Sequence, residues 1–239
     1  LTRLKGGHPW LYRTNLREGA LTETEPGLLS VGEGWFFYSP QSEIRLRRLG
    51  PFGAALPGVD ESFIDDPQTF QKIFGESLRQ HFRDVFLRKK KAVGGESCFR
   101  WIFSESDFVP GLVVDAFDND LVAQIQTAPM EKFWPAVRPA LEAAFRDATA
   151  SEARVTEMRN TPVRRKEGLE VIEPAKESEG RGRWIAWNGF EWWMNPGGPQ
   201  KTGAYLDQKD NHRAAARWAK DLGYSEAWDL CSFEASPPA

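Results

Sequence analysis

The feature that most constrains the fold is a helical pattern of apolar residues in the first half of the chain. An α-helix repeats about every 3.6 residues, so apolar positions three and four apart lie on one face. The residues with this spacing are Phe70, Ile73, Phe74, Leu78, Phe82, Val85 and Phe86. Asp65 or Asp66 can cap the start, Pro67 suits the first turn, and Gly94 and Gly95 can end the helix. The pattern therefore predicts a long helix with one buried, phenylalanine-rich face.

Short β segments precede this helix. "HPWLY", "WFFYS" and "EIRLRRL" are aromatic or alternating runs separated by Gly and Pro, which is typical of strands and turns. In "SEIRLRRL", Ile44, Leu46 and Leu49 are expected to point inward and the arginines outward. These runs predict a small β-barrel or sandwich, followed by a linker at residues 57–66.

Strands and helices alternate after the helix. The turn at Asp118–Asp120 and the pair Asn188–Gly189 each predict a hairpin. Pro135 and Pro139 fall in or near the first turns of a second helix. Strands are expected at residues 97–103, 111–117, 121–127, 152–159 and 226–233, and helices at 129–148 and 207–223. This order predicts an α+β multidomain protein whose last helix and strand open a further α/β unit.

Composition excludes several classes of protein. The chain has 239 residues, 41% hydrophobic and 27% charged, as in an ordinary globular protein. No apolar run approaches the ~18 residues of a membrane span, and the first residues lack the apolar core of a signal peptide. Cys98 and Cys231 are too few for a disulfide framework or a zinc site. We therefore expect two buried, reduced thiols, no metal and a cytoplasmic protein away from membranes.

Charge points in two directions. A net charge of −3 and a pI of about 5.8 argue against a nucleic-acid-binding protein, which is usually basic. The cations are nevertheless clustered, in "RLRR", "RKKK", "RRK" and "RGR". Each cluster alone is usually a solvated surface, but the four together suggest a basic stripe.

A dense polar run, "GGPQKTGAYLDQKDNHR", stands before the last expected helix at residues 197–213. With several other stretches it resembles the bacterial PUA-domain-containing, S-adenosylmethionine (SAM)-dependent RNA methyltransferases. Their best-known group, the 23S ribosomal RNA large subunit methyltransferase I proteins, makes 5-methylcytosine. The matching pieces are "GGHPWLYRTNL" at 6–16, "YSPQSEIRLRRL" at 38–49, "FSESDFVPGLVVDAF" at 103–117, "VRRKEGL" at 163–169, "GPQKTGAYLDQKDNHRAAA" at 198–216 and "AWDLCSF" at 227–233.

The resemblance implies three domains and a cofactor. Residues 1–56 would be a PUA-like RNA-binding domain, 57–187 a central α+β domain, and 188–239 the incomplete start of a Rossmann-like SAM-dependent methyltransferase domain. The residues it places beside SAM are Gln200, Lys201, Thr202, Tyr205, Asp207, Gln208, Asn211 and Asp229. Asp207 could pair with the ammonium group of SAM, and Lys201 and Thr202 with its carboxylate. Alternatively, Asp207 caps the following helix and Lys201 is solvated.

The sequence departs from the family after its last expected strand. No glycine follows Gly223, so the family's glycine-rich cofactor turn is missing. Cytosine C5 methylation needs a cysteine thiolate, and neither Cys98 nor Cys231 stands where the family places its nucleophile. No catalytic residue is assigned. We therefore expect an N-terminal portion of such an enzyme that transfers no methyl group alone. A stand-alone RNA-binding module and a different RNA base or small-molecule substrate are the alternatives.

RNA, most simply ribosomal RNA, is the expected partner, and a homodimer is compatible with the sequence. Phosphate binding needs Arg and Lys side chains on one surface. The candidates are Lys5, Arg13, Arg45, Arg47, Arg48, Arg88, Lys89, Lys90 and Lys91. Trp10 and Tyr12 could stack on bases, although core packing is the alternative for at least one of them. His8 is expected to form local structural hydrogen bonds.

Overall fold

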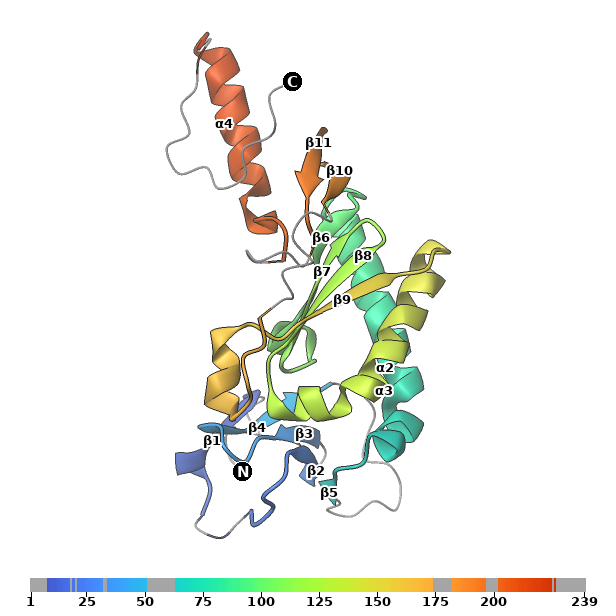
Figure 1. Cartoon of the computed structure of the whole chain (residues 1–239), viewed down its shortest axis with the longest axis vertical. Coiled ribbons are helices and arrows are strands. Elements are labelled where there is room, and N and C mark those ends of the chain that lie inside the picture. Colours follow the sequence, from blue (N-terminus) through green and yellow to red (C-terminus); the bar gives the residue numbers. More distant parts are fainter. Residues whose placement is uncertain are drawn as a thin grey trace.

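A computed structural model describes the following residues: 8–17, 19, 21–31, 34–50, 63–173, 182–196, 202–224 and 226. In this part of the chain, three sheets and three α-helices form an α+β structure (Figure 1). The predicted residues Lys5, Gln200, Lys201, Asp229 and Cys231, and most of the expected strand at 226–233, lie outside the described residues.

The N-terminal sheet is fully antiparallel, in the order β1-β4-β3-β2-β5. Its strands are β1 (Trp10–Tyr12), β2 (Gly27–Val31), β3 (Gly34–Tyr38), β4 (Ile44–Leu49) and β5 (Phe63–Ile64). The three runs expected to be strands become β1, β3 and β4. β2 was not expected, and β5 falls inside the predicted linker. The described ladders run from β1 to β5 and identify no closed barrel.

The long helix is confirmed as α2 (Pro67–Ala92). Its start is fixed by Asp66, whose carboxylate accepts a hydrogen bond from the Thr69 backbone N–H at 2.8 Å. The second helix, α3 (Ala128–Thr149), begins before both prolines, which therefore lie inside it. Pro135 and Pro139 are exposed, so water can hydrate the carbonyls that lack a helical partner.

The central sheet has the order β6-β7-β8-β9, with only β8 and β9 parallel. Its strands are β6 (Cys98–Phe103), β7 (Leu112–Phe117), β8 (Asp120–Ile125) and β9 (Arg154–Met158). The buried faces of α2 and α3 cover one side of this sheet (Figure 1). The same core reaches the N-terminal sheet, because Phe133 of α3 stacks on Phe37 of β3 at 5.7 Å and on Phe70 of α2 at 4.4 Å. One continuous core thus crosses the expected domain boundary near residue 56.

A hairpin covers part of the other side of the central sheet. It consists of β10 (Arg183–Trp187) and β11 (Phe190–Met194). Asn188 and Gly189 have φ values of 59° and 85°, so the predicted Asn-Gly turn is confirmed. Its inward side chains form a second core with the sheet: Cys98, Phe117, Val122, Met158, Ile185, Trp187, Met194 and Ala204. The expected boundary between residues 187 and 188 falls inside this hairpin.

The last described helix, α4 (Lys209–Asp221), confirms the helix expected at residues 207–223. None of its residues is buried. With the hairpin it lies at the opposite end of the molecule from the N-terminal sheet (Figure 1). None of the helices in the described ranges is long and apolar enough to cross a membrane.

Two glycines with positive φ test how tightly the central sheet is packed. A Cβ at Gly111 (φ +79°) would lie 2.0 Å from the Thr127 hydroxyl oxygen, whereas a Cβ at Gly95 (φ +84°) would meet nothing within 4 Å. We expect Gly95→Ala to lower the free energy of unfolding by about 1 kcal/mol through backbone strain alone. Gly111→Ala should cost about 1–3 kcal/mol more because of the steric clash. Urea denaturation of both variants checks this, and equal losses would contradict the packing at Gly111.

Candidate nucleic-acid interface

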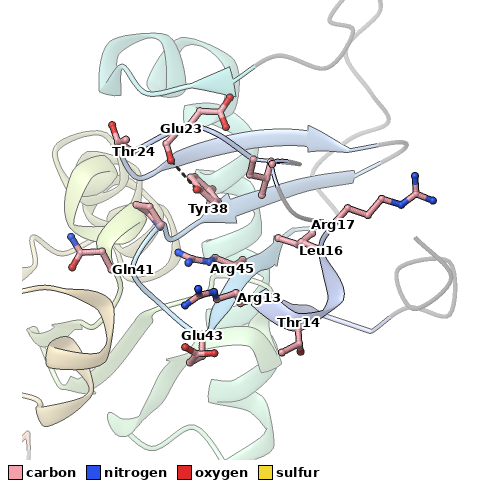
Figure 2. A pocket seen from close by; sticks show the side chains of 13 residues that line it. Arg13, Thr14, Leu16, Arg17, Glu23, Thr24, Tyr38, Gln41, Glu43 and Arg45 are labelled. Carbon is pink, nitrogen blue, oxygen red and sulfur yellow. Dashed lines mark hydrogen bonds between the residues drawn. The ribbon is translucent and has the colours of Figure 1, made fainter.

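An open cavity of about 830 Å³ on the N-terminal sheet contains three arginines, Arg13, Arg17 and Arg45 (Figure 2). Arg45 belongs to β4, and Arg13 begins a short 3₁₀ turn that directly follows β1. The pairing of β1 with β4 brings the two together, because the Arg13 backbone N–H donates to the Glu43 carbonyl at 2.8 Å. Figure 2 shows the Arg13 and Arg45 side chains extending to the same side and Arg17 to the other. We call this site the arginine cavity.

The three arginines share the arginine cavity with two carboxylates, Glu23 and Glu43, but no ion pair joins them within the described part of the chain. Arg13 and Arg17 form no side-chain hydrogen bond or ion pair with another described residue, and Arg45 donates only to the Ser39 carbonyl, at 3.3 Å. The Tyr38 hydroxyl donates to the Glu23 carbonyl at 2.8 Å. Burial raises the Tyr38 pKa, with Arg45 opposing it in part, so the side chain stays a neutral phenol. Guanidinium groups without a carboxylate partner suit phosphate oxygens, which they can bind through two hydrogen bonds.

Arg47 does not face outward as the sequence suggested. It is only 8% exposed, and its guanidinium donates to Glu105 at 3.0 Å and to Glu167 at 2.7 Å. Leu49 lies on the same face of β4 and belongs to the core that includes α2, α3 and the central sheet. This face of β4 therefore packs toward the central sheet and its helices. Arg47 is therefore a buried structural cation, whereas Arg48 is half-buried on the other face of β4.

The basic run at the end of α2 is also partly structural. Arg88 pairs with Asp107 at 3.2 Å, and Lys89 pairs with the same carboxylate. Asp107 is only 3% exposed, so these cations compensate a buried negative charge. Lys90 lies over the Phe86 ring at 5.7 Å, and Lys91 is exposed. Of the predicted RNA-binding residues that the structure describes, it brings only Arg13 and Arg45 together in the arginine cavity.

One of the predicted cofactor residues, Thr202, contacts a buried carboxylate. Thr202, only 2% exposed, donates its hydroxyl to Asp115 at 2.6 Å. Arg100 holds the same carboxylate through two bonds of 2.8 and 3.0 Å. The bond to Asp115 raises the Arg100 pKa, against opposing burial, and Asp207 adds a smaller effect. These contacts join residues that are far apart in sequence, so sequence patterns did not reveal them.

The described members of this set do not line a common cavity. Asn211 donates to Gln208 at 2.6 Å, and Asp207 is exposed. The helix-capping alternative is not observed either, because the residue at the cap position of α4 is Gln208 and its side chain makes no capping bond. Thr202, Tyr205, Asp207, Gln208 and Asn211 line none of the three cavities described, which measure about 830, 1050 and 510 Å³. They do not fit around SAM by themselves, and no chemical step is assigned to them.

Burial raises the pKa of the Cys98 thiol to about 11, although a hydrogen bond with Ser97 opposes this shift. The side chain therefore stays a protonated thiol at neutral pH, which makes it a poor nucleophile. Among the residues that the structure describes, no group of three or more His, Cys, Asp or Glu side chains could hold a metal ion.

The Thr202 contact can be tested by an isosteric change. Thr202→Val removes the hydroxyl and leaves that oxygen of buried Asp115 with the Arg100 guanidinium as its remaining described side-chain donor. We expect the free energy of unfolding to fall by about 1–3 kcal/mol, measured by urea denaturation. Thr156→Val, at an exposed position of β9, is the control and should change it by less than about 0.5 kcal/mol. If Thr202→Val were equally neutral, the hydroxyl would not be committed to Asp115.

Glu105 should make stability depend on pH. Burial raises the pKa of its carboxyl, but bonds from Ser104 and its own backbone N–H, together with Arg47, outweigh burial and hold the pKa below its ordinary value. As the pH falls, the unfolded chain, with a Glu pKa of about 4.3, takes up the proton first. The stabilisation is therefore complete above that pH and is lost as the pH falls through the folded pKa.

We expect Glu105→Gln to be less stable than wild type by about 1.5–3 kcal/mol at neutral pH, with the difference shrinking below about pH 4. Urea denaturation across this range measures it. Glu152→Gln, whose carboxylate is exposed and paired with Arg146, is the control and should show a much smaller pH dependence. A constant difference for Glu105→Gln would contradict the assigned role of the carboxylate.

Known proteins similar to this chain are methyltransferases. No family model matches it. "Ribosomal RNA large subunit methyltransferase I" of Pseudoalteromonas translucida is 32% identical over 229 residues, 91% of this chain and 52% of that protein. The protein of the same name from Cronobacter sakazakii is 34% identical over 228 residues, with 90% and 51% covered.

The fold has relatives among solved structures. A protein from Streptococcus mutans assigned as a SAM-dependent methyltransferase matches with a TM-score of 0.55 and 16% identity, over 89% of this chain and 50% of that one. SMU.776, assigned as a methyltransferase and solved in complex with SAH, matches with a TM-score of 0.55 and 17% identity, over 88% and 49%. The chain spans about half the length of the curated relatives it matches. It is homologous to the N-terminal part of ribosomal RNA large subunit methyltransferase I.

Proposed function

We propose that this chain is the RNA-binding half of a SAM-dependent methyltransferase that acts on cytosine C5 of 23S ribosomal RNA. The observation that carries the proposal is the arginine cavity, in which Arg13 and Arg17 have no described partner and Arg45 has only a weak one. The homology supplies the reaction class, because the similar proteins are named as large-subunit ribosomal RNA methyltransferases. In this proposal residues 1–56 are the PUA-like domain, residues 57–187 the central α+β domain, and residues 188–239 the incomplete start of the methyltransferase domain.

The arginine cavity accounts for RNA binding by a chain with a net charge of −3. Phosphate contacts depend on local cations and release counterions, so a single basic site can bind RNA although the whole chain is acidic. The site sets three arginines against the two carboxylates of Glu23 and Glu43, and it also contains neutral hydrogen-bonding groups, among them Gln41, Thr14 and Thr24. Such groups contact ribose and phosphate oxygens without adding charge.

Methyl transfer would depend on residues other than those that the structure describes. SAM would supply the methyl group in the whole enzyme, yet the described part of the predicted SAM set encloses no cavity. We propose that this chain by itself binds RNA and transfers no methyl group. A stand-alone RNA-binding module is the second candidate, favoured by the way Thr202 and Asn211 are bonded to Asp115 and Gln208 instead of facing a cavity.

The test removes the cations of the arginine cavity. We expect the triple variant Arg13→Ala, Arg17→Ala, Arg45→Ala to bind a fluorescent single-stranded RNA of about 12 nucleotides at least tenfold more weakly in about 0.1 M salt. The slope of log K against log salt should shrink by about 1 for each lost phosphate contact. Fluorescence anisotropy at several salt concentrations measures both quantities.

Arg146→Ala is the matched control, because Arg146 is an exposed arginine of α3 that pairs with Glu152. It should leave the affinity and the salt slope nearly unchanged. The proposed RNA site is wrong if the triple variant binds like the control. Calorimetric titration of SAM into the chain separates the two candidate functions, since heat of binding would place a cofactor site in this half and exclude a simple RNA-binding module.

A further inference from the structure

A second cavity, of about 1050 Å³, lies where the N-terminal sheet meets the open side of the central sheet. It is lined from β1, β4, β6, β7 and β8 and from the 3₁₀ turns at Ser104–Asp107 and Pro162–Glu167. Gln41 and Glu43 line both this cavity and the arginine cavity, so the two are neighbours. We call the second site the aromatic cleft.

Three aromatic side chains line the aromatic cleft: Trp10, Tyr12 and Phe103. The Trp10 indole N–H donates to Glu105 at 3.1 Å, and the Trp10 ring meets the Tyr12 ring edge-on, with 6.4 Å between the ring centroids. Phe103 stays 49% exposed, and the Arg100 guanidinium lies 5.1 Å from the centre of its ring. An exposed ring with a cation already on it offers a surface on which a further planar group can stack.

Hydrogen-bonding groups occupy the same cleft. The Gln126 amide N–H donates to the Gln124 amide oxygen at 3.0 Å. That bond leaves the Gln124 amide nitrogen and the Gln126 amide oxygen without a partner among the described residues. A donor and an acceptor side by side match the edge of a nucleobase, which also presents both. Lys166 adds positive charge for the attached phosphates.

The base of the aromatic cleft is held in place before any ligand arrives. Arg47 joins Glu105 to Glu167, and Glu105 in turn holds the Trp10 ring. A fixed aromatic wall loses little conformational freedom when it binds, which favours affinity. The cavity is also large enough for a nucleotide, since small-molecule sites range over about 300–1,000 Å³.

We propose that the aromatic cleft binds an unstacked nucleobase of the RNA whose backbone lies on the arginine cavity. This inference rests on the proposed RNA-binding function and adds to it a site that reads bases. Phosphates on Arg13 and Arg45 bring the strand to the shared residues Gln41 and Glu43, and the next base enters the cleft. There it stacks on Phe103, and its edge meets Gln124 and Gln126.

The test compares two single-stranded RNAs of about 12 nucleotides that differ only in their bases, one complete and one with abasic ribose at its central positions. The wild-type chain should bind the complete RNA about tenfold more tightly. The reason is that stacking of one base on an aromatic side chain contributes about this much to the binding affinity. Phe103→Ala should reduce this preference nearly to unity. Phe103→Tyr should retain it, since the stacking ring remains.

Phe108→Ala is the matched control, because Phe108 is 45% exposed nearby but does not line the cleft. It should preserve the preference for complete RNA. The Arg13→Ala, Arg45→Ala double variant should weaken both RNAs equally, since it removes phosphate contacts alone. Thermal melting of each variant confirms that it is folded.

The outcomes separate the two proposals. RNA binding with equal affinity for the two RNAs in wild type, or an unchanged preference in Phe103→Ala, would overturn the nucleobase cleft and leave the arginine cavity intact. No binding of either RNA would overturn the proposed function and this inference with it. Loss of preference in Phe103→Ala, with retention in Phe103→Tyr and Phe108→Ala, supports the cleft.

Discussion

Arg47 on β4 places its guanidinium between two carboxylates that come from distant parts of the chain, Glu105 and Glu167. Removing one partner of such a buried set typically costs about 3–5 kcal/mol, because an uncompensated charge remains. The contact therefore fixes the N-terminal sheet against two turns of the central unit. Glu105 also receives the Trp10 indole N–H, so the position of the cleft wall depends on the same ion pairs. The stacked rings of Phe37, Phe70 and Phe133 join the two units on their apolar side.

This arrangement divides the arginines into two functional groups. Some, such as Arg47 and Arg100, pair with buried carboxylates and orient neighbouring side chains. Those at the arginine cavity, Arg13 and Arg17, have no described carboxylate partner and remain available to an anionic ligand. An acidic chain can thus present a locally basic surface, because unpaired cations gather at one site. The two adjacent cavities then offer phosphate binding at one and base stacking at the other.

The chain is similar to known methyltransferases in both sequence and fold. The sequence is 32–34% identical to ribosomal RNA large subunit methyltransferase I proteins over about half of their length. The fold matches methyltransferase structures at 16–17% identity, which concerns the fold alone. In the segment that resembles the family's cofactor loop, the described side chains bond to the central sheet and to one another. The contacts of the described residues therefore bear on the proposed RNA recognition, whereas the proposed methyl transfer comes from sequence similarity alone.

Local patterns determined much of this protein without tertiary information. The spacing of phenylalanines, with Asp65 or Asp66 as the cap, predicted α2, and Asn188–Gly189 predicted the β10–β11 turn, because such signals act over a few residues. The two-residue strand β5 was missed, since nothing local distinguishes it from a linker. Only the tertiary structure decided that Arg47 is buried and that Thr202 bonds Asp115, as these partners lie 58, 120 and 87 residues away. Periodicity shows that a side chain faces inward or outward from its own strand, but which unit packs on that face depends on the whole fold.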